Sequence, residues 1–311
     1  MDLLQLRYFR MVAREESISR VAEQLRVAQP SLSRTIARLE NELGVPLFDR
    51  QGRRIRLNRF GASFLARVER ALGELDDARQ ELTDLAGLDK GSVAIAAENV
   101  TSIRDVVAEF LHAHPGVRVR LFQSTATVMA ERLAAGEIDF GVLSQQPAPG
   151  LSVLELMNDQ VLLGVSLDHP LASRQSVTLA EMAAQPFLTT GPEYWQRILL
   201  ERLCAKVCRR PIIACEGDDP TSLRALVATG LGVVLLPTMA RSIAGPEITG
   251  VPIDDPDARR LLRIAWREDA YLSIAAQRFR EMAIDHFARR ASTEKGAGAE
   301  STDALQNSAQ E

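Results

Sequence analysis

Arginine, serine and glutamine residues recur within residues 29–43 at a spacing that could bind a nucleic acid. In a helix, Leu32, Ile36, Leu39 and Leu43 would form one narrow apolar stripe. The opposite face and the exposed first turn would carry the residues Gln29, Pro30, Ser31, Ser33, Arg34, Ala37, Arg38 and Asn41. Guanidinium, hydroxyl and amide groups bind phosphate oxygens and base edges of duplex DNA. An amphipathic helix with an ordinary solvated face explains this pattern equally well.

Four more arginines follow within residues 47–57, LFDRQGRRIRL. This segment predicts two short strands around a turn at Gln51-Gly52. The arginines of the predicted hairpin are Arg50, Arg53, Arg54 and Arg56. Their guanidinium groups repel one another unless a polyanion is present, so the hairpin favours contact with phosphates or insertion into a narrow minor groove.

Hydroxyl and amide side chains also cluster at four predicted strand-to-helix turns. These turns are residues 99–102, 124–127, 189–192 and 218–221. The free amides and partial positive charge of a helix N-terminus favour a small anion. An ordinary helix N-cap explains any single turn, and Asp219-Pro220 is most typical of one.

The basic segments belong to a predicted helical head. Hydrophobic spacing predicts helices over residues 3–14 and 19–26, the second capped by Ser19, and a turn at 27–28 precedes the helix that ends at Gly44. This order is typical of a helix-turn-helix followed by a wing. Residues 60–85 then predict one long helix with a coiled-coil seam formed by Leu65, Val68, Leu72, Leu75 and Leu82. Packing of that stripe against the chain's own body is the alternative, and residues 87–91 predict a hinge.

From Ser92 onward, strand and helix patterns alternate, which predicts an α/β body with mostly parallel pairing. The last helix is expected over residues 271–289. The remaining residues, 291–311, are small, polar and acidic, and we expect them to be disordered.

The head resembles a known DNA-binding domain. LRYF, SxSRVAEQL, AQPSLSRTIARLENELGVPLFDR and RxxRLNRFG follow one another between Leu6 and Gly61. In content, order and spacing this run resembles the winged helix-turn-helix of LysR-type bacterial transcription regulators, although Ile18 stands where members often have a small or aromatic residue. The resemblance implies DNA contact by Gln29, Pro30, Ser33, Arg34 and Arg53. Face geometry and the hairpin add Ser31, Arg38, Arg50 and Arg54 as DNA-binding candidates.

The body resembles the effector-binding domain of the same family, which has two lobes like a type 2 periplasmic solute-binding protein. The resemblance implies a first lobe of residues 92–163 and 264–290 and a second lobe of residues 164–263. It also implies that the first three turns line the cleft between the lobes. The resulting effector-binding candidates are Asn99, Thr101, Ser102, Ser124, Thr125, Thr127, Thr190 and Gly191. Few of them are charged, so we expect a small carboxylate or a neutral polar metabolite.

The charge distribution agrees with this division. The chain has a formal net charge of −4. Residues 1–70 hold 14 arginines, no lysine and 8 acidic residues, a net charge of +6, so the remainder carries −10. A basic head on an acidic body predicts that only the head contacts nucleic acid.

Other chemistry finds little support in the sequence. A signal peptide and an 18-residue apolar run are missing, and three cysteines are too few for a disulfide scaffold, so we expect a cytoplasmic protein. Cys204 and Cys208, four residues apart on a predicted helix, are poorly spaced for a disulfide, and Cys215 is the other candidate for a redox role. The four histidines have no metal-site spacing, and common catalytic motifs are missing.

Together these patterns predict a multi-domain regulator without cofactor, metal or enzymatic activity. The expected parts are an all-α winged helix-turn-helix head (1–59), a dimerising linker helix and hinge (60–91), a two-lobed α/β effector-binding domain (92–290) and a tail (291–311). Expected partners are double-stranded promoter DNA, a small-molecule effector and further copies of the chain in a homodimer or homotetramer, with RNA polymerase as another candidate and no membrane. The alternative is an α/β solute-binding or transferase-like protein whose basic head contacts another protein.

Overall fold

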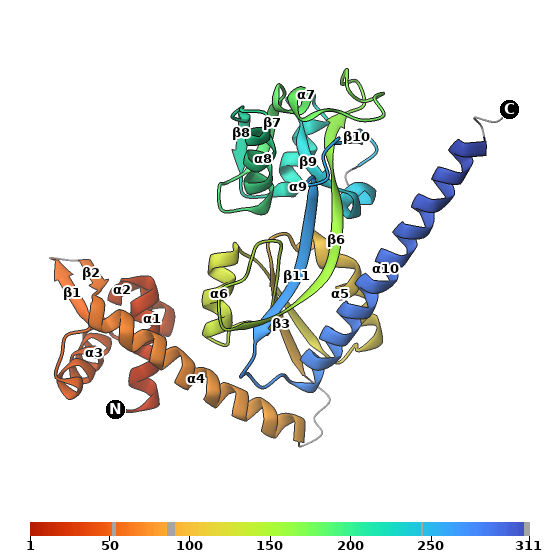
Figure 1. The fold of residues 1–311 in the computed structure, drawn as a ribbon. Coiled ribbons are helices and arrows are strands. Elements are labelled where there is room, and N and C mark those ends of the chain that lie inside the picture. The colour runs from red at the N-terminus through yellow and green to blue at the C-terminus, as the bar shows by residue number, and fades with distance from the viewer. Residues whose placement is uncertain (52–53, 86–90, 244, 308–311) are drawn as a thin grey trace. The chain divides into compact units, whose positions relative to one another are not determined.

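A computed structural model describes residues 1–51, 54–85, 91–243 and 245–307 of the chain (Figure 1). These residues form two compact units that divide near residue 87. The first unit is helical with a small hairpin, and the second is built on a large mixed sheet. The predicted division into a head and an α/β body therefore matches the fold.

The N-terminal unit contains four helices and one hairpin among its described residues. They are α1 (Leu3–Glu15), α2 (Ile18–Leu25), α3 (Gln29–Leu43), β1 (Phe48–Gln51), β2 (Arg54–Leu57) and α4 (Arg59–Leu85). The prediction of Ser19 as the cap of α2 is wrong, because the Ser17 side chain accepts the backbone N–H of Arg20. Gly44 ends α3 with a φ of 73°, as predicted.

The core of the head explains part of the apolar stripe on α4. Val68 and Leu72 are 3% and 2% exposed and belong to the same cluster as Phe9 of α1. Leu65 packs against this cluster as well. These three residues were expected in a dimer seam, but they fill the head's own core, which was the alternative interpretation.

The rest of the predicted seam remains exposed. Leu75 and Leu82 are 41% and 66% exposed, so α4 presents apolar side chains to solvent beyond the head. A dimer contact of α4 is therefore still expected, but with Leu75 and Leu82 rather than with the whole stripe.

Gly61 allows the first turn of α4 to approach the wing closely. Asn58 caps α4 by accepting the N–H groups of Phe60 and Gly61 at 2.9 Å, and its Nδ2 donates to the Pro46 carbonyl at 2.9 Å. A Cβ on Gly61 would lie 2.1 Å from the Leu47 carbonyl oxygen. Only glycine fits this position without a shift of the backbone.

We expect Gly61→Ala to destabilise the head by about 1–3 kcal/mol, because the added methyl group overpacks a backbone contact. Hydrogen–deuterium exchange of peptides from α1 to α3 measures this change in the full chain. Ser63→Ala, an exposed change in the same helix, is the matched control and should leave exchange unaltered. Equal protection in Gly61→Ala and in the wild type would contradict the expected clash.

The second unit contains the following described strands and helices in chain order. They are β3 (Ser92–Ala97), a 3-10 turn (Val100–Ile103), α5 (Arg104–Ala113), β4 (Arg118–Gln123), α6 (Ala126–Ala134), β5 (Phe140–Leu143), β6 (Leu151–Ser166), α7 (Leu179–Ala183), β7 (Pro186–Thr190), α8 (Trp195–Lys206), β8 (Ile212–Gly217), α9 (Pro220–Val227), β9 (Val234–Pro237), a second 3-10 turn (Thr238–Ile243), β10 (Ile248–Pro252), β11 (Arg259–Arg267) and α10 (Ile274–Asn307).

Two long strands join the lobes of this unit. β6 spans 16 residues and pairs antiparallel with β11, while its far half pairs antiparallel with β9 and β10. Only the pairs β3–β4, β3–β5 and β7–β8 are parallel among the named strands. The expected mostly parallel pairing is therefore wrong, since a chain that crosses to the second lobe on β6 returns in the opposite direction on β11.

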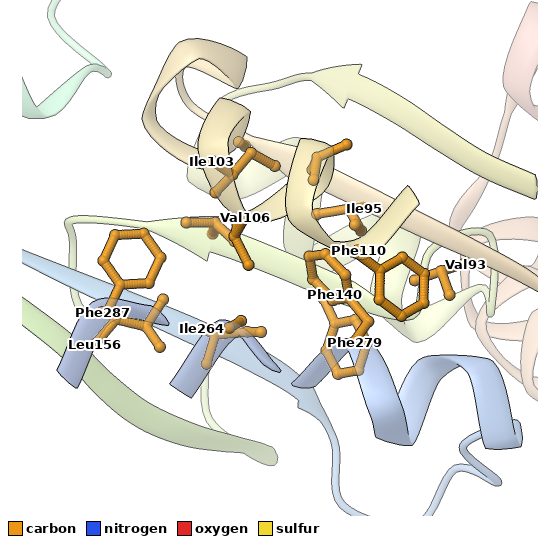
Figure 2. Close-up of a cluster of buried hydrophobic side chains, with 14 of the residues drawn as sticks. Val93, Ile95, Ile103, Val106, Phe110, Phe140, Leu156, Ile264, Phe279 and Phe287 are labelled. Atoms are coloured by element: carbon orange, nitrogen blue, oxygen red, sulfur yellow. The ribbon is translucent and has the colours of Figure 1, made fainter. Parts of the chain in front are cut away.

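Each lobe has its own hydrophobic core. In the first lobe, Phe110 of α5 packs edge-to-face on Phe279 of α10 with ring centroids 5.3 Å apart (Figure 2). Along β6, Met157 belongs to this core, whereas Val161 belongs to the core of the second lobe. At the start of β11 the change falls between Ala258, which precedes the strand, and Leu262. At both strands the chain thus passes from one core to the other a few residues before the expected lobe boundaries, which lie after residues 163 and 263.

Helix α10 extends beyond the predicted closing helix. Residues 291–307 were expected to be disordered, but they continue α10 to Asn307. The segment lacks proline and holds four alanines beside two glycines, and extending an existing helix costs little once its first turns pack on the core. The side chains beyond Arg290 lie outside the described residues.

Candidate functional site

The exposed face of α3 is the first candidate site. Leu32, Ile36 and Leu39 are fully buried in the head's core, as the apolar stripe predicted. The opposite face leaves Arg34 and Arg38 exposed. The first turn exposes Gln29, Pro30 and Ser31, and Ser33 is half-buried. The candidates on α3 therefore lie together on one solvent-facing surface.

The structure also shows what holds this surface next to the hairpin. The Glu40 side chain of α3 accepts the backbone N–H groups of Leu47 and Phe48 at 2.8 and 3.2 Å. β1 and β2 pair antiparallel, which confirms the predicted hairpin. Arg53 and the side chains of Arg50 and Arg54, which were predicted to contact DNA, lie outside the described residues.

A pocket between the two lobes of the second unit is the second candidate site. Its space is about 580 Å³, including solvent at the mouth. The first lobe contributes the turn after β3, and the second contributes β7, α8 and α9. Four predicted effector residues line the pocket: Asn99, Thr101, Ser102 and Thr190.

Hydrogen bonds shape the first-lobe side of this pocket. The Asn99 side chain accepts from the backbone N–H and the Oγ1 of Thr101 at 2.9 and 2.7 Å. Ser102 Oγ donates to the Asn99 carbonyl at 2.6 Å. On the second lobe, Thr190 Oγ1 donates to Gln196 Oε1 at 3.4 Å. The polar groups at the turn after β3 are thus held in one arrangement that faces the pocket.

The other four predicted effector residues do not line this pocket. They are Ser124, Thr125, Thr127 and Gly191. Thr125 Oγ1 accepts the Val128 N–H at 3.5 Å at the start of α6, which is an ordinary capping contact. Ser124 is buried and Thr127 is exposed. A turn with suitable side chains therefore does not define a ligand site unless the fold turns it toward the cavity.

Two buried arginines on the pocket wall were not among the effector-binding residues predicted from the sequence. Arg224 of α9 and Arg260 of β11 are 7% and 4% exposed, and both line the pocket. The Arg224 guanidinium donates to Thr221 Oγ1 at 3.3 Å. Arg260 Nε donates to Ser144 Oγ at 2.7 Å, and its guanidinium lies 4.7 Å from the Trp195 ring centroid. For Arg224 the available signal was an arginine within a largely apolar helix pattern, whereas the strand of Arg260 holds four arginines and gives no such signal.

Two buried carboxyl groups attract Arg260 from outside the pocket lining. Glu98 accepts the Ser144 N–H at 2.8 Å, and Asp159 accepts the Met239 N–H at 3.1 Å and also bonds Thr238. Burial raises the pKa of both carboxyl groups, while the charge of Arg260 opposes that rise. Burial lowers the pKa of both Arg260 and Arg224. Two acids that do not line the pocket therefore oppose the effect of burial on the pKa of Arg260.

Two donors of the pocket lack a protein partner within the described residues. They are Nη2 of Arg260 and Nε1 of Trp195, and both atoms are buried. A buried donor without a partner is costly, and charged donors are the costliest. A ligand that carries an acceptor group is one way to satisfy such donors.

The other candidate chemistries receive no structural support. Cys204, Cys208 and Cys215 are all free, and burial raises the pKa of Cys204. Among the described residues, neither a group of metal-ligating side chains nor a helix long and apolar enough to cross a membrane is found.

Comparisons with known proteins assign the same two parts. A family model described as bacterial regulatory helix-turn-helix protein, lysR family, matches residues 3–62, and one described as LysR substrate binding domain matches residues 86–288. An uncharacterized HTH-type transcriptional regulator of Bacillus subtilis, YybE, is 35% identical over 92% of the chain and 99% of its own length. The B. subtilis transcriptional dual regulator GltC is 30% identical over 93% and 98%.

Solved structures agree on the fold. A full-length OxyR variant from Pseudomonas aeruginosa has a TM-score of 0.68 at 23% identity, and the match covers 92% of the chain and 94% of OxyR. Full-length CbnR in complex with its target DNA has a TM-score of 0.64 at 25% identity, with coverage of 94% and 100%.

Proposed function

Since the chain belongs to the LysR family and is a DNA-binding transcriptional regulator with an effector-binding domain, we propose that its effector is a small anion bound by Arg224 and Arg260. The family relatives are regulators and not enzymes, so the alternative of a transferase-like protein is not favoured. We further propose the chemical class of the effector, the residues that contact the effector and the DNA, and the way in which two copies of the chain associate.

One observation carries the choice of an anion. Arg224 and Arg260 line one pocket, no acidic side chain lines it among the described residues, and two buried donors there lack partners. The sequence predicts a carboxylate or a neutral polar metabolite, and we propose the carboxylate, because Asp219 attracts Arg224 but no carboxylate lines the pocket itself among the described residues. Asn99, Thr101, Ser102 and Thr190 would orient the rest of the ligand.

The position of the pocket suggests how the effector acts. Thr101 and Ser102 belong to the first lobe, whereas Thr190 and Arg224 belong to the second, so a ligand that contacts both groups favours one arrangement of the lobes. An effector can shift a regulator only by the difference in its affinity for two arrangements. We propose that this difference arises from contact with both lobes at once.

The head would supply the DNA contacts. We propose that Gln29, Pro30, Ser31, Ser33, Arg34 and Arg38 face the major groove and that the hairpin arginines contact phosphates. Two copies joined through the exposed part of α4, with Leu75 and Leu82, would place two heads on two half-sites. A regulator of promoter DNA works in the bacterial cytoplasm, which is the location we propose.

Isothermal titration with carboxylates and their neutral amide isosteres tests the effector class. We use succinate and benzoate against succinamide and benzamide, and we expect only carboxylates to bind. Arg224→Gln should weaken binding by about 10- to 100-fold, because a hydrogen bond to a charged group contributes about 1.5–3 kcal/mol.

Thr125→Val is the control for this titration, since Thr125 was a sequence candidate that does not line the pocket. It should leave affinity within about twofold. Equal affinity for acid and amide, or no effect of Arg224→Gln on a carboxylate that binds, would refute the proposed anion site.

A further inference from the structure

A second cavity, here named the arginine cavity, borders the effector pocket. Its space is about 920 Å³, including solvent at the mouth. Trp195 and Arg260 line both spaces. Three further arginines line the arginine cavity alone: Arg202 of α8 and Arg259 and Arg263 of β11.

Strand geometry brings these arginines together. Side chains two residues apart on a strand point to the same side, so Arg259, Leu261 and Arg263 share one face of β11. Arg202 reaches the same cavity from α8 of the second lobe. The sequence Arg259-Arg260-Leu-Leu-Arg263 thus places positive charge toward a cavity on the strand that joins the two lobes.

The partners of these guanidinium groups are mostly neutral. Arg202 donates to the Asp257 carbonyl at 3.3 Å, and Arg259 donates to the side chain and carbonyl of Asn158 at 2.9 and 2.7 Å. Arg263 donates to the carbonyls of Ser144 and Gln145 at 3.1 and 3.3 Å. Backbone and amide oxygens orient a guanidinium group, but they do not neutralise its charge.

Carboxylates near the arginine cavity are exposed or already paired. Glu155 lies 3.8 Å from Arg263, and its side chain is 66% exposed. Asp255 attracts Arg202 but already binds Lys206 at 2.6 Å. Glu98 and Asp159 attract only Arg260 among these arginines. No acidic side chain lines the cavity among the described residues. Glu98 and Asp159 already offset the charge of Arg260, so the excess of positive charge there comes from Arg202, Arg259 and Arg263.

We propose that the arginine cavity is a second anion site and that it takes a small, multiply charged anion with a phosphate or pyrophosphate group. Guanidinium groups match phosphate oxygens in charge and in paired hydrogen-bond geometry. A singly charged ligand would leave most of the positive charge uncompensated. Because Arg260 also borders the effector pocket, ligands of the two sites act on the same side chain.

Isothermal titration of the full chain with inorganic pyrophosphate tests the second site. The double variant Arg202→Gln, Arg259→Gln should weaken pyrophosphate binding by about tenfold or more, because it removes two charge-assisted contacts. Both side chains are exposed, so we expect the variant to fold. Arg263→Gln should weaken binding independently.

Two control variants test whether the loss of pyrophosphate affinity is specific to the arginine cavity. Arg209→Gln with Arg210→Gln removes the same charge from exposed residues of the same lobe and should change affinity by less than about threefold. Arg224→Gln removes charge from the effector pocket alone and should also have little effect, even if the proposed effector site fails its own test. Absence of binding, an equal loss in the Arg209/Arg210 variant, or an equal loss in Arg224→Gln would overturn the proposal.

Discussion

Arg260→Met is expected to destabilise the second unit by about 1–3 kcal/mol at pH 8, the cost typical of leaving buried polar groups without a partner. The variant removes the cation that both Glu98 and Asp159 face and leaves two buried carboxyl groups without it. It also removes the hydrogen bond to Ser144 and the contact with the Trp195 ring. The methionine side chain preserves most of the volume, so the loss reports mainly on charge.

The loss of stability caused by Arg260→Met should be smaller at pH 5 than at pH 8. Burial raises the pKa of Glu98 and Asp159 above the ordinary values of 4.5 and 3.8, so the folded state binds protons more tightly than the unfolded state. Such groups lower stability as pH rises from the ordinary pKa to the raised one. Without Arg260 both pKa values rise further. The pH range over which the two groups lower stability then extends to higher pH, so the variant loses more stability at pH 8 than at pH 5.

Urea unfolding at the two pH values measures this effect. Trp195 and Trp266 are the two tryptophans of the chain, and both belong to the second unit, so their fluorescence follows it. Arg209→Gln, an exposed change in the same unit, should cost less than about 0.5 kcal/mol. Adding Glu98→Gln and Asp159→Asn to Arg260→Met should restore much of the stability. If Arg260→Met loses the same stability at both pH values and the two added substitutions restore none of it, the explanation by charge is wrong.

Arg34→Ala is expected to reduce the preference for the operator over unrelated DNA by about 10-fold or more, since a paired contact to a base contributes about 1–3 kcal/mol of discrimination. Arg34 is exposed on α3, and its Nε donates to the Pro30 carbonyl at 3.3 Å, which holds the guanidinium over the first turn of the helix. The first turn is the part of such a helix that contacts base edges.

A gel-shift titration measures this preference with an operator selected from random duplexes and a shuffled duplex of equal length. Arg67→Ala removes one exposed positive charge from α4 and should leave the ratio of the two affinities within about twofold. If Arg34→Ala lowers both affinities equally, Arg34 contacts phosphate and not bases.

Local patterns predicted the head well. Helical periodicity alone separates Leu32, Ile36 and Leu39 from Arg34 and Arg38, because 3.6 residues per turn determine which side chains share a face. The same reasoning failed for α4. A stripe of leucines shows that a helix face is apolar but not what covers it, and Val68 and Leu72 are covered by the head itself.

The pocket that we propose for the effector is formed by segments that lie far apart in the sequence. The turns at Thr101 and Thr125 are alike in sequence, yet only the first lines the pocket, since the direction of a turn follows from how its strand sits in the sheet. Arg224 and Arg260 come from α9 and β11 and meet because β6 and β11 carry the chain between the lobes.

The sequence by itself therefore determined the family, the order of the two units and the solvent-exposed side of α3. These features depend on residue types and on spacing within one element. Only the tertiary structure decided that Arg224 and Arg260 line one pocket and that Arg202 lies with Arg259 and Arg263 at the arginine cavity, since folding brings together residues far apart in the chain. Such charges are costly to bury and rarely lack a partner, which is why their position indicates ligands of opposite charge.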